Sequence, residues 1–145
     1  MAAQKFISNQ NDLYTVLIIS QDADMVSVWE TLFEQRNCTV ISEATPYDGI
    51  QTSNLLAPAL VIVDIDLPEP ERLALCRELR TTTNGTLLLI NSNYNTIDPL
   101  EYHRAGVDET VINSISPLAL LIKSLAWLAR SDWIVPRRQP AQLWA

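Results

Sequence analysis

Leu60-Val-Ile-Val-Asp64-Ile-Asp-Leu-Pro68 is the stretch that decides the fold, because an apolar run leads directly into two aspartates and a proline. A continuous apolar run of this length, without alternation, is typical of a strand that is covered on both faces. Such strands lie inside parallel sheets. The two aspartates then follow the carboxyl end of a strand, which is where open α/β sheets bind their ligands.

The same pattern recurs on either side of this stretch. Short β-rich runs predict strands at 15–19, 39–41, 60–63, 86–90 and 110–112. Between and after them, apolar residues at helical spacing predict helices at 24–36, 46–56, 70–80, 98–104 and 117–130. The strict alternation of strand and helix predicts an α/β fold with a doubly wound five-stranded parallel sheet.

Composition excludes several classes of function. The 145 residues suffice for one domain, and 10 basic against 17 acidic residues give a net charge of −7. This charge disfavours nucleic acid and anionic membranes as partners, since both are polyanions. With 3 glycines, 2 cysteines and 1 histidine, the sequence offers no glycine-rich phosphate loop, zinc site or disulfide framework. We expect a reduced, cytoplasmic protein that carries no cofactor and is not an enzyme.

The predicted elements divide the chain into three parts. Residues 1–13 are expected to form a flexible leader, and residues 14–130 the folded domain. Residues 131–145 are expected to form a tail that its two prolines keep from being a regular helix. On this division the chain is a stand-alone domain without an attached output domain.

In order and spacing, these residues resemble the receiver domains of two-component response regulators over about residues 14–130. The stretch at 60–68, followed by Leu73-Ala-Leu-Cys-Arg-Glu-Leu-Arg80, looks like the family's phosphoacceptor strand, loop and third helix. Asp48-Gly49, Ala105-Gly106-Val-Asp108 and Ser116-Pro117 match in the same order. The resemblance implies a flavodoxin-like (βα)5 fold and a bacterial signalling role. It also implies a histidine kinase or another signalling protein as partner.

The resemblance places Asp64 at the phosphoacceptor position, but the positions around it depart from the family. The acidic pair that holds Mg²⁺ falls on Ser20 and Gln21, with Asp22 one place later; the switch hydroxyl falls on Asn91 and the lysine on Asn113. Phosphoryl transfer needs cations to screen the charge that develops on the phosphoryl oxygens. We therefore predict a pseudo-receiver in which Asn91, Asn113 and Ser92 donate hydrogen bonds to Asp64.

Two other functions stay open. One is a phosphoryl-accepting receiver that holds Mg²⁺ with Asp22, Asp64 and Asp66. The other is a flavodoxin-like cofactor binder, which is disfavoured because residues 20–24 carry two acids where a phosphate would lie. Simpler roles compete for the same residues: Asp64 and Asp66 can be polar residues at a strand end. Either Asp22 or Asp24 can cap the first helix, and capping is the favoured role of Asp24.

The last predicted helix carries apolar residues on more than one face. At 100° per residue, the expected core face holds Leu118, Leu121, Ile122, Leu125, Leu128 and Ala129. Leu120 and Trp127 fall on the opposite side, where we expect them to be exposed. With Trp133 of the tail they predict a contact surface for a partner or for a second copy of the chain. The alternative is that the tail folds back and covers them.

Overall fold

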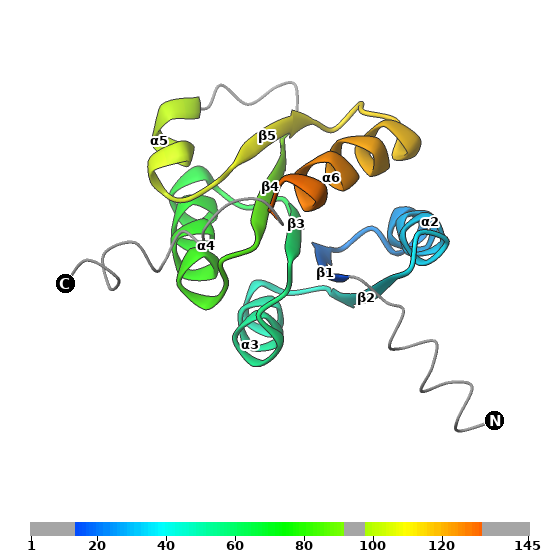
Figure 1. Ribbon diagram of the computed structural model, residues 1–145. Helices are drawn as coiled ribbons and strands as arrows, with labels where there is room; N and C mark the ends of the chain where they lie inside the picture. Colours follow the sequence, from blue (N-terminus) through cyan, green and yellow to red (C-terminus); the bar gives the residue numbers. More distant parts are fainter. Residues whose placement is uncertain (1–13, 92–97, 132–145) are drawn as a thin grey trace.

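The computed structural model describes residues 14–91 and 98–131 of the chain (Figure 1). Strands and helices alternate throughout these residues, in the predicted order and close to the predicted bounds. They are β1 (Tyr14–Ser20), α2 (Ala23–Glu34), β2 (Cys38–Glu43), α3 (Pro46–Leu56), β3 (Leu60–Asp64), α4 (Glu69–Thr82), β4 (Thr86–Asn91), α5 (Pro99–Arg104), β5 (Glu109–Ile112) and α6 (Pro117–Ser131).

The five strands form one parallel sheet in the order β2-β1-β3-β4-β5. The chain runs from β1 outward to β2 and then returns across β1 to form β3, so that β1 and β3 are neighbours at the point where the strand order reverses. This point is the usual ligand site of open α/β sheets. The register between the two strands places Ser20 directly opposite Asp64.

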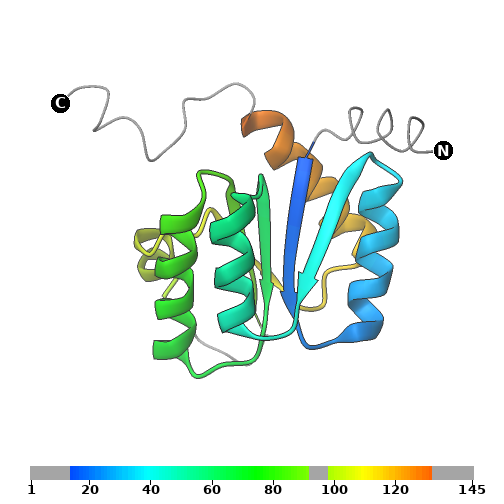
Figure 2. The ribbon, with the colours of Figure 1, turned by 90° about the horizontal axis from the view of Figure 1, so that it is seen from below.

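Helices cover both faces of the sheet, as the continuous apolar strands predicted. Helices α2 and α6 lie on one face, and α3, α4 and α5 lie on the other (Figures 1 and 2). Alternate strand residues supply the two cores: Val16 and Ile18 pack towards α2 and α6, whereas Leu17 and Ile19 pack towards the other three helices. The predicted doubly wound architecture is confirmed.

Helix starts follow from side-chain caps, with one difference from the prediction. The Asp22 carboxylate accepts the main-chain N–H of Met25 at 3.1 Å and caps α2, so Asp24 lies inside the first turn and is not the cap. A cap supplies a hydrogen-bond acceptor to one of the first main-chain N–H groups of a helix, which have no partner within the helix. The cap predicted for the last helix is confirmed, because Ser116 Oγ accepts the N–H of Ala119 at 3.1 Å.

The orientation of α6 confirms part of the predicted core face and contradicts the rest: Leu121 and Leu128 are buried as expected, whereas Ala129 is exposed. Leu120 is 0% exposed and belongs to the core, whereas Leu118 and Ile122 are 55% and 61% exposed. The buried stripe is centred on Ser124, which is also 0% exposed. Apolar residues occur all around this helix, so their spacing did not fix which face lies on the sheet. The expected exposure of Leu120 is therefore wrong.

The sequence predicted reduced thiols, and the structure shows the surroundings of Cys76. Cys76 is fully buried between α4 and the sheet, where burial raises the pKa of its thiol to about 12. A thiol with this pKa stays protonated and unreactive at neutral pH.

Within 14–91 and 98–131, no helix is long and apolar enough to cross a membrane. The expected leader, Ser92, and the tail with Trp133 lie outside the described residues.

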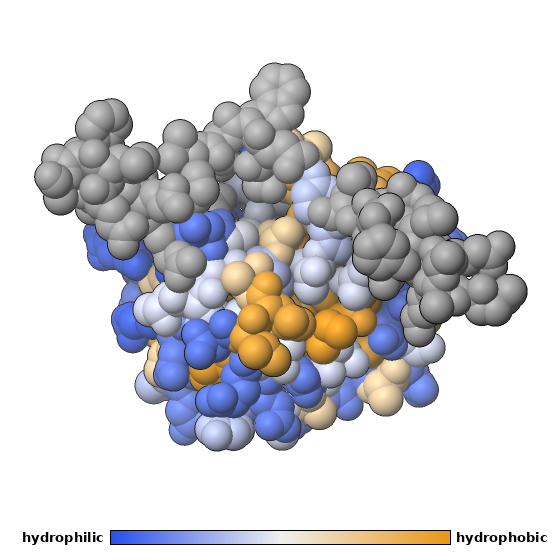
Figure 3. Space-filling model, turned by 60° about the horizontal axis from the view of Figure 1, so that its bottom comes forward, coloured by the Kyte–Doolittle hydropathy of each residue, from blue (hydrophilic) through white to orange (hydrophobic). Residues whose placement is uncertain are grey.

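One apolar patch lies on the side where α3 comes forward (Figure 3). The exposed large apolar residues of α3 are Leu55, which is 82% exposed, and Leu56, which is 43% exposed. Hydrophilic residues surround much of the patch in this view. Patches of this kind are common on soluble proteins, and its presence alone indicates no particular partner.

Candidate functional site

The candidate site lies at the carboxyl ends of β1 and β3. Both strands are buried to their last residues: Ser20 is 5% exposed, and Val63, next to Asp64, is fully buried. Because the strands are parallel neighbours in register, Ser20 and Asp64 are brought side by side across the strand pair. The structure thus brings together three of the predicted pocket residues, since the loop after Ser20 also carries Asp22 to this edge.

Two hydrogen bonds connect these residues. Ser20 Oγ donates to Asp64 Oδ2 at 2.9 Å, and the main-chain N–H of Asp22 donates to Ser20 Oγ at 3.1 Å. A serine hydroxyl has one proton to donate and lone pairs to accept with. The Ser20 hydroxyl uses both functions, and so links the end of β3 to the start of α2.

The electrostatic environment of Asp64 opposes its charge. Burial raises the pKa of its carboxyl group, the hydrogen bond from Ser20 lowers it, and the nearby negative charge of Asp22 raises it again. The result is a pKa above the ordinary value for aspartate. Among the described residues, no cation contributes to this shift. The charged form of Asp64 therefore depends on one hydroxyl donor.

The other predicted pocket residues are placed differently. Gln21, Asp66 and Asn113 are exposed. The main-chain N–H of Asn113 donates to the Asn91 carbonyl at 2.8 Å, which joins the ends of β4 and β5. The side-chain donor that the structure gives to Asp64 is Ser20, whereas hydrogen bonds from the amides of Asn91 and Asn113 stay a prediction. Ser92, the third predicted donor, lies outside the described residues.

These residues do not fit a Mg²⁺ ion. Magnesium requires a near-octahedral set of oxygen ligands and is usually held by one or two carboxylates that can reach it together. At this edge, Asp64 shares one oxygen with Ser20, Asp22 caps α2, and Asp66 is exposed. Within the described residues, no group of three or more His, Cys, Asp or Glu side chains could hold a metal ion.

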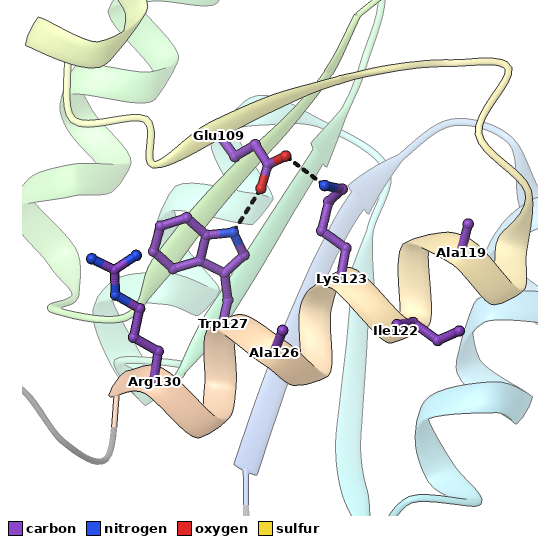
Figure 4. Close-up of a pocket in the computed structure, with 7 residues that line it drawn as sticks. All are labelled: Glu109, Ala119, Ile122, Lys123, Ala126, Trp127 and Arg130. Atoms are coloured by element: carbon purple, nitrogen blue, oxygen red, sulfur yellow. Dashed lines mark hydrogen bonds and ion pairs between the residues drawn. The ribbon is translucent and has the colours of Figure 1, made fainter.

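A second cluster, which the sequence did not predict, lies at the β5 edge of the sheet, beside α6 (Figure 4). Glu109 is the first residue of β5. Its carboxylate forms an ion pair with the Lys123 ammonium at 2.7 Å and accepts a hydrogen bond from the Trp127 indole N–H at 2.8 Å. The Arg130 guanidinium lies 5.0 Å from the centre of the Trp127 ring. Lys123 and Trp127 stand four residues apart on α6, and this spacing was the available sequence signal.

This cluster borders an open groove of about 490 Å³ along the outer side of α6. Ala119, Ile122 and Ala126 line it together with the cluster. Burial raises the pKa of the Glu109 carboxyl group, but the hydrogen bonds from Lys123 and Trp127 and the charge of Lys123 outweigh this and leave it below its ordinary value. Trp127 is partly buried and shares the groove with Ile122.

Comparison with solved structures shows the same fold in response regulator receivers. A CheY-like receiver domain protein from Methanospirillum hungatei aligns with a TM-score of 0.74 and 20% identity, covering 83% of this chain and 97% of that one. A two-component response regulator from Clostridium difficile aligns with a TM-score of 0.72 and 20% identity, covering 83% and 99%. The receiver fold expected from the resemblance is confirmed.

The sequence is also similar, at low identity, to curated regulatory proteins. The aerobic respiration control protein ArcA of Escherichia coli is 29% identical over 119 residues, which cover 80% of this chain and 49% of that protein. The DNA-binding response regulator MtrA of Mycolicibacterium paratuberculosis is 24% identical over 119 residues, covering 81% and 52%. The chain spans about half the length of the curated relatives it matches. No protein-family model matches the chain.

Proposed function

We propose that this chain, which has the receiver fold of response regulators, is a signalling module of a two-component system that acts by protein–protein contact. In this proposal it is a pseudo-receiver: Asp64 keeps the phosphoacceptor position but does not accept a phosphoryl group at an appreciable rate. The observation that carries the proposal is the hydrogen bond from Ser20 to Asp64, at the position where the family has a metal-binding acid.

The chemistry of phosphoryl transfer supports this reading. Charge develops on the transferred phosphoryl group and on the carboxylate that attacks it, and cations must lie against both. Among the described residues, the charge that shifts the pKa of Asp64 is the carboxylate of Asp22, which repels an incoming phosphate. Asn113, at the family's lysine position, carries no charge. The pocket therefore disfavours the reaction electrostatically, although the acceptor is present.

The contact surface in this proposal is the face that α6 presents with β5. Its exposed apolar residues are Leu118, Ile122 and, at the end of β5, Ile112. Trp127 and the groove beside it lie on the same face. Leu120, which is buried, takes no part. The partner is a histidine kinase or another signalling protein in the cytoplasm, with a second copy of the chain as a further possibility. The module itself has no enzymatic activity.

The test is incubation with Mg²⁺ and acetyl phosphate, followed by intact-mass measurement of the whole chain. The pseudo-receiver gives no mass gain above that of an Asp64→Asn control. A gain of one phosphoryl group in the wild type that disappears in Asp64→Asn would overturn the proposal.

One observation favours the phosphoryl-accepting alternative. The main chain of Asp22 is bonded to Ser20, which in turn bonds Asp64, so a second carboxylate stands near Asp64 at this edge of the sheet. If the mass gain occurs, Asp22→Asn separates the roles: loss of the gain would show that Asp22 takes part in the reaction. In contrast, no observation on the described residues favours a flavodoxin-like cofactor site.

A further inference from the structure

We infer that the Ser20 hydroxyl takes the structural place of a divalent cation at Asp64, so that the pocket keeps its shape without Mg²⁺ and does not respond to it. The inference rests on the proposed function and names the residues that separate the pocket from metal. Ser20 is in this view a positioning residue: it acts through Asp64 and through the start of α2.

The first argument is the position of Ser20. It ends β1 directly opposite Asp64 in the parallel register, and its Oγ atom lies 2.9 Å from Asp64 Oδ2. Ser20 is 5% exposed, so water competes little for this bond. A cation that approached Oδ2 would share this oxygen with the hydroxyl proton, which already occupies one of its lone pairs and would repel the cation.

The second argument is that the Ser20 oxygen is itself engaged. It accepts the main-chain N–H of Asp22 at 3.1 Å, at the residue that caps α2. Using Ser20 Oγ as a metal ligand would place a cation beside an N–H donor and remove that donor's acceptor. The bond network Asp64–Ser20–Asp22 thus connects β3, β1 and α2 in the way that a shared metal ion connects its ligands.

The third argument concerns the carboxylates that remain. The Asp22 carboxylate accepts the Met25 N–H at 3.1 Å, so turning it towards Asp64 would leave the first turn of α2 without its cap. Gln21 contributes an exposed amide in place of an acid. One free oxygen of Asp64 is weak support for an ion that dehydrates as reluctantly as Mg²⁺. Two residues, Ser20 and Gln21, therefore account for the exclusion of the metal.

This inference predicts that two substitutions create a Mg²⁺ site. Ser20→Asp with Gln21→Asp places two carboxylates next to Asp64 while Asp22 continues to cap α2. The matched control is Ser20→Asn with Gln21→Asn, which adds side chains of the same size without charge. A third variant adds Asp64→Asn to the two aspartates and removes the central ligand.

The experiment is thermal unfolding of the whole chain at increasing MgCl₂, with KCl at equal ionic strength as reference. The melting temperatures of the wild type and the Asn control are expected to stay unchanged by Mg²⁺. The two-aspartate variant is expected to gain several degrees at about 10 mM Mg²⁺ by mass action. This gain is expected to disappear with Asp64→Asn. If the variant is unfolded in EDTA, recovery of its circular dichroism by Mg²⁺ reports the same binding.

Either of two results would overturn the inference. One is a wild-type melting temperature that rises with Mg²⁺ and loses the rise in Asp64→Asn, because Asp64 would then bind the metal despite Ser20. The other is a two-aspartate variant that gains nothing from Mg²⁺. The proposed function fails separately: a wild type that ignores Mg²⁺ but gains a phosphoryl group would refute the pseudo-receiver and leave the role of Ser20 standing.

Discussion

Asp64 and Glu109 are two partly buried carboxylates of one sheet, at the end of the central strand β3 and at the start of the edge strand β5, and their pKa values move in opposite directions. Burial disfavours the charge of both. Glu109 receives a lysine ammonium and an indole N–H, which more than offset burial. Asp64 receives one serine hydroxyl and has another carboxylate nearby, so that its pKa stays raised.

The two carboxylates differ in whether a cationic side chain lies beside them. At the position that resembles a phosphoacceptor, the described residues supply no cation to the carboxylate. At the start of β5, a cation and a donor on α6 hold a carboxylate at the border of an open groove. In the proposed function, the first region is the phosphoacceptor position of a pseudo-receiver and the second borders the proposed contact surface.

The largest expected effect concerns the orientation of α6, on which the Glu109 region depends. Leu120→Ala removes a fully buried side chain and is expected to lower the free energy of unfolding by about 2–5 kcal/mol, through lost burial and a new cavity. Ile122→Ala, on the outer side, is expected to change it by less than about 0.5 kcal/mol. Urea unfolding measures both. Equal losses would contradict the observed orientation of the helix.

A smaller effect is expected at Glu109. Glu109→Gln removes the ion pair with Lys123, which is partly exposed and therefore screened, and should cost about 0.5–1 kcal/mol at pH 7. Because the pKa of Glu109 is lowered in the folded state, its contribution is present above the unfolded pKa and is lost as the pH falls through the folded value. Glu101→Gln, at an exposed position on α5, is the control. A loss that persists unchanged at pH 2.5 would contradict the electrostatic origin.

The smallest effect is expected at Asp64, with the opposite sign. The raised pKa means that its contribution to stability is present below the unfolded pKa and is lost as the pH rises through the folded value. Asp64→Asn removes a poorly supported charge and keeps an acceptor for Ser20, so it should raise stability at pH 7 by about 0.5 kcal/mol. Asp66→Asn, which is exposed, should leave it unchanged. A clear loss of stability in Asp64→Asn would indicate that the carboxylate is better supported than the structure shows.

The sequence predicted the fold well because continuous apolar strands and their alternation with amphipathic helices are local or nearly local signals. It also predicted that residues after β1 and β3 meet, since the carboxyl ends of parallel strands share one edge. The donor to Asp64 was not predicted: the amides were expected from the family pattern, whereas the register placed Ser20 opposite. The core face of α6 was predicted only in part: Leu121 and Leu128 are buried as expected, but the face is centred on a small buried serine, Ser124, which the apolar spacing could not indicate. The spacing of Lys123 and Trp127 was available in the sequence, but their contact with Glu109 depends on which face of α6 lies on the sheet.

The most direct test of the contrast between the two regions is one carboxyl-carbon NMR titration of the wild-type chain, with and without Mg²⁺. The structure predicts that Asp64 titrates above the ordinary value for aspartate and Glu109 below that for glutamate. It also predicts that Mg²⁺ moves neither pKa. A fall in the pKa of Asp64 when Mg²⁺ is added would show a functioning metal pocket and contradict the account.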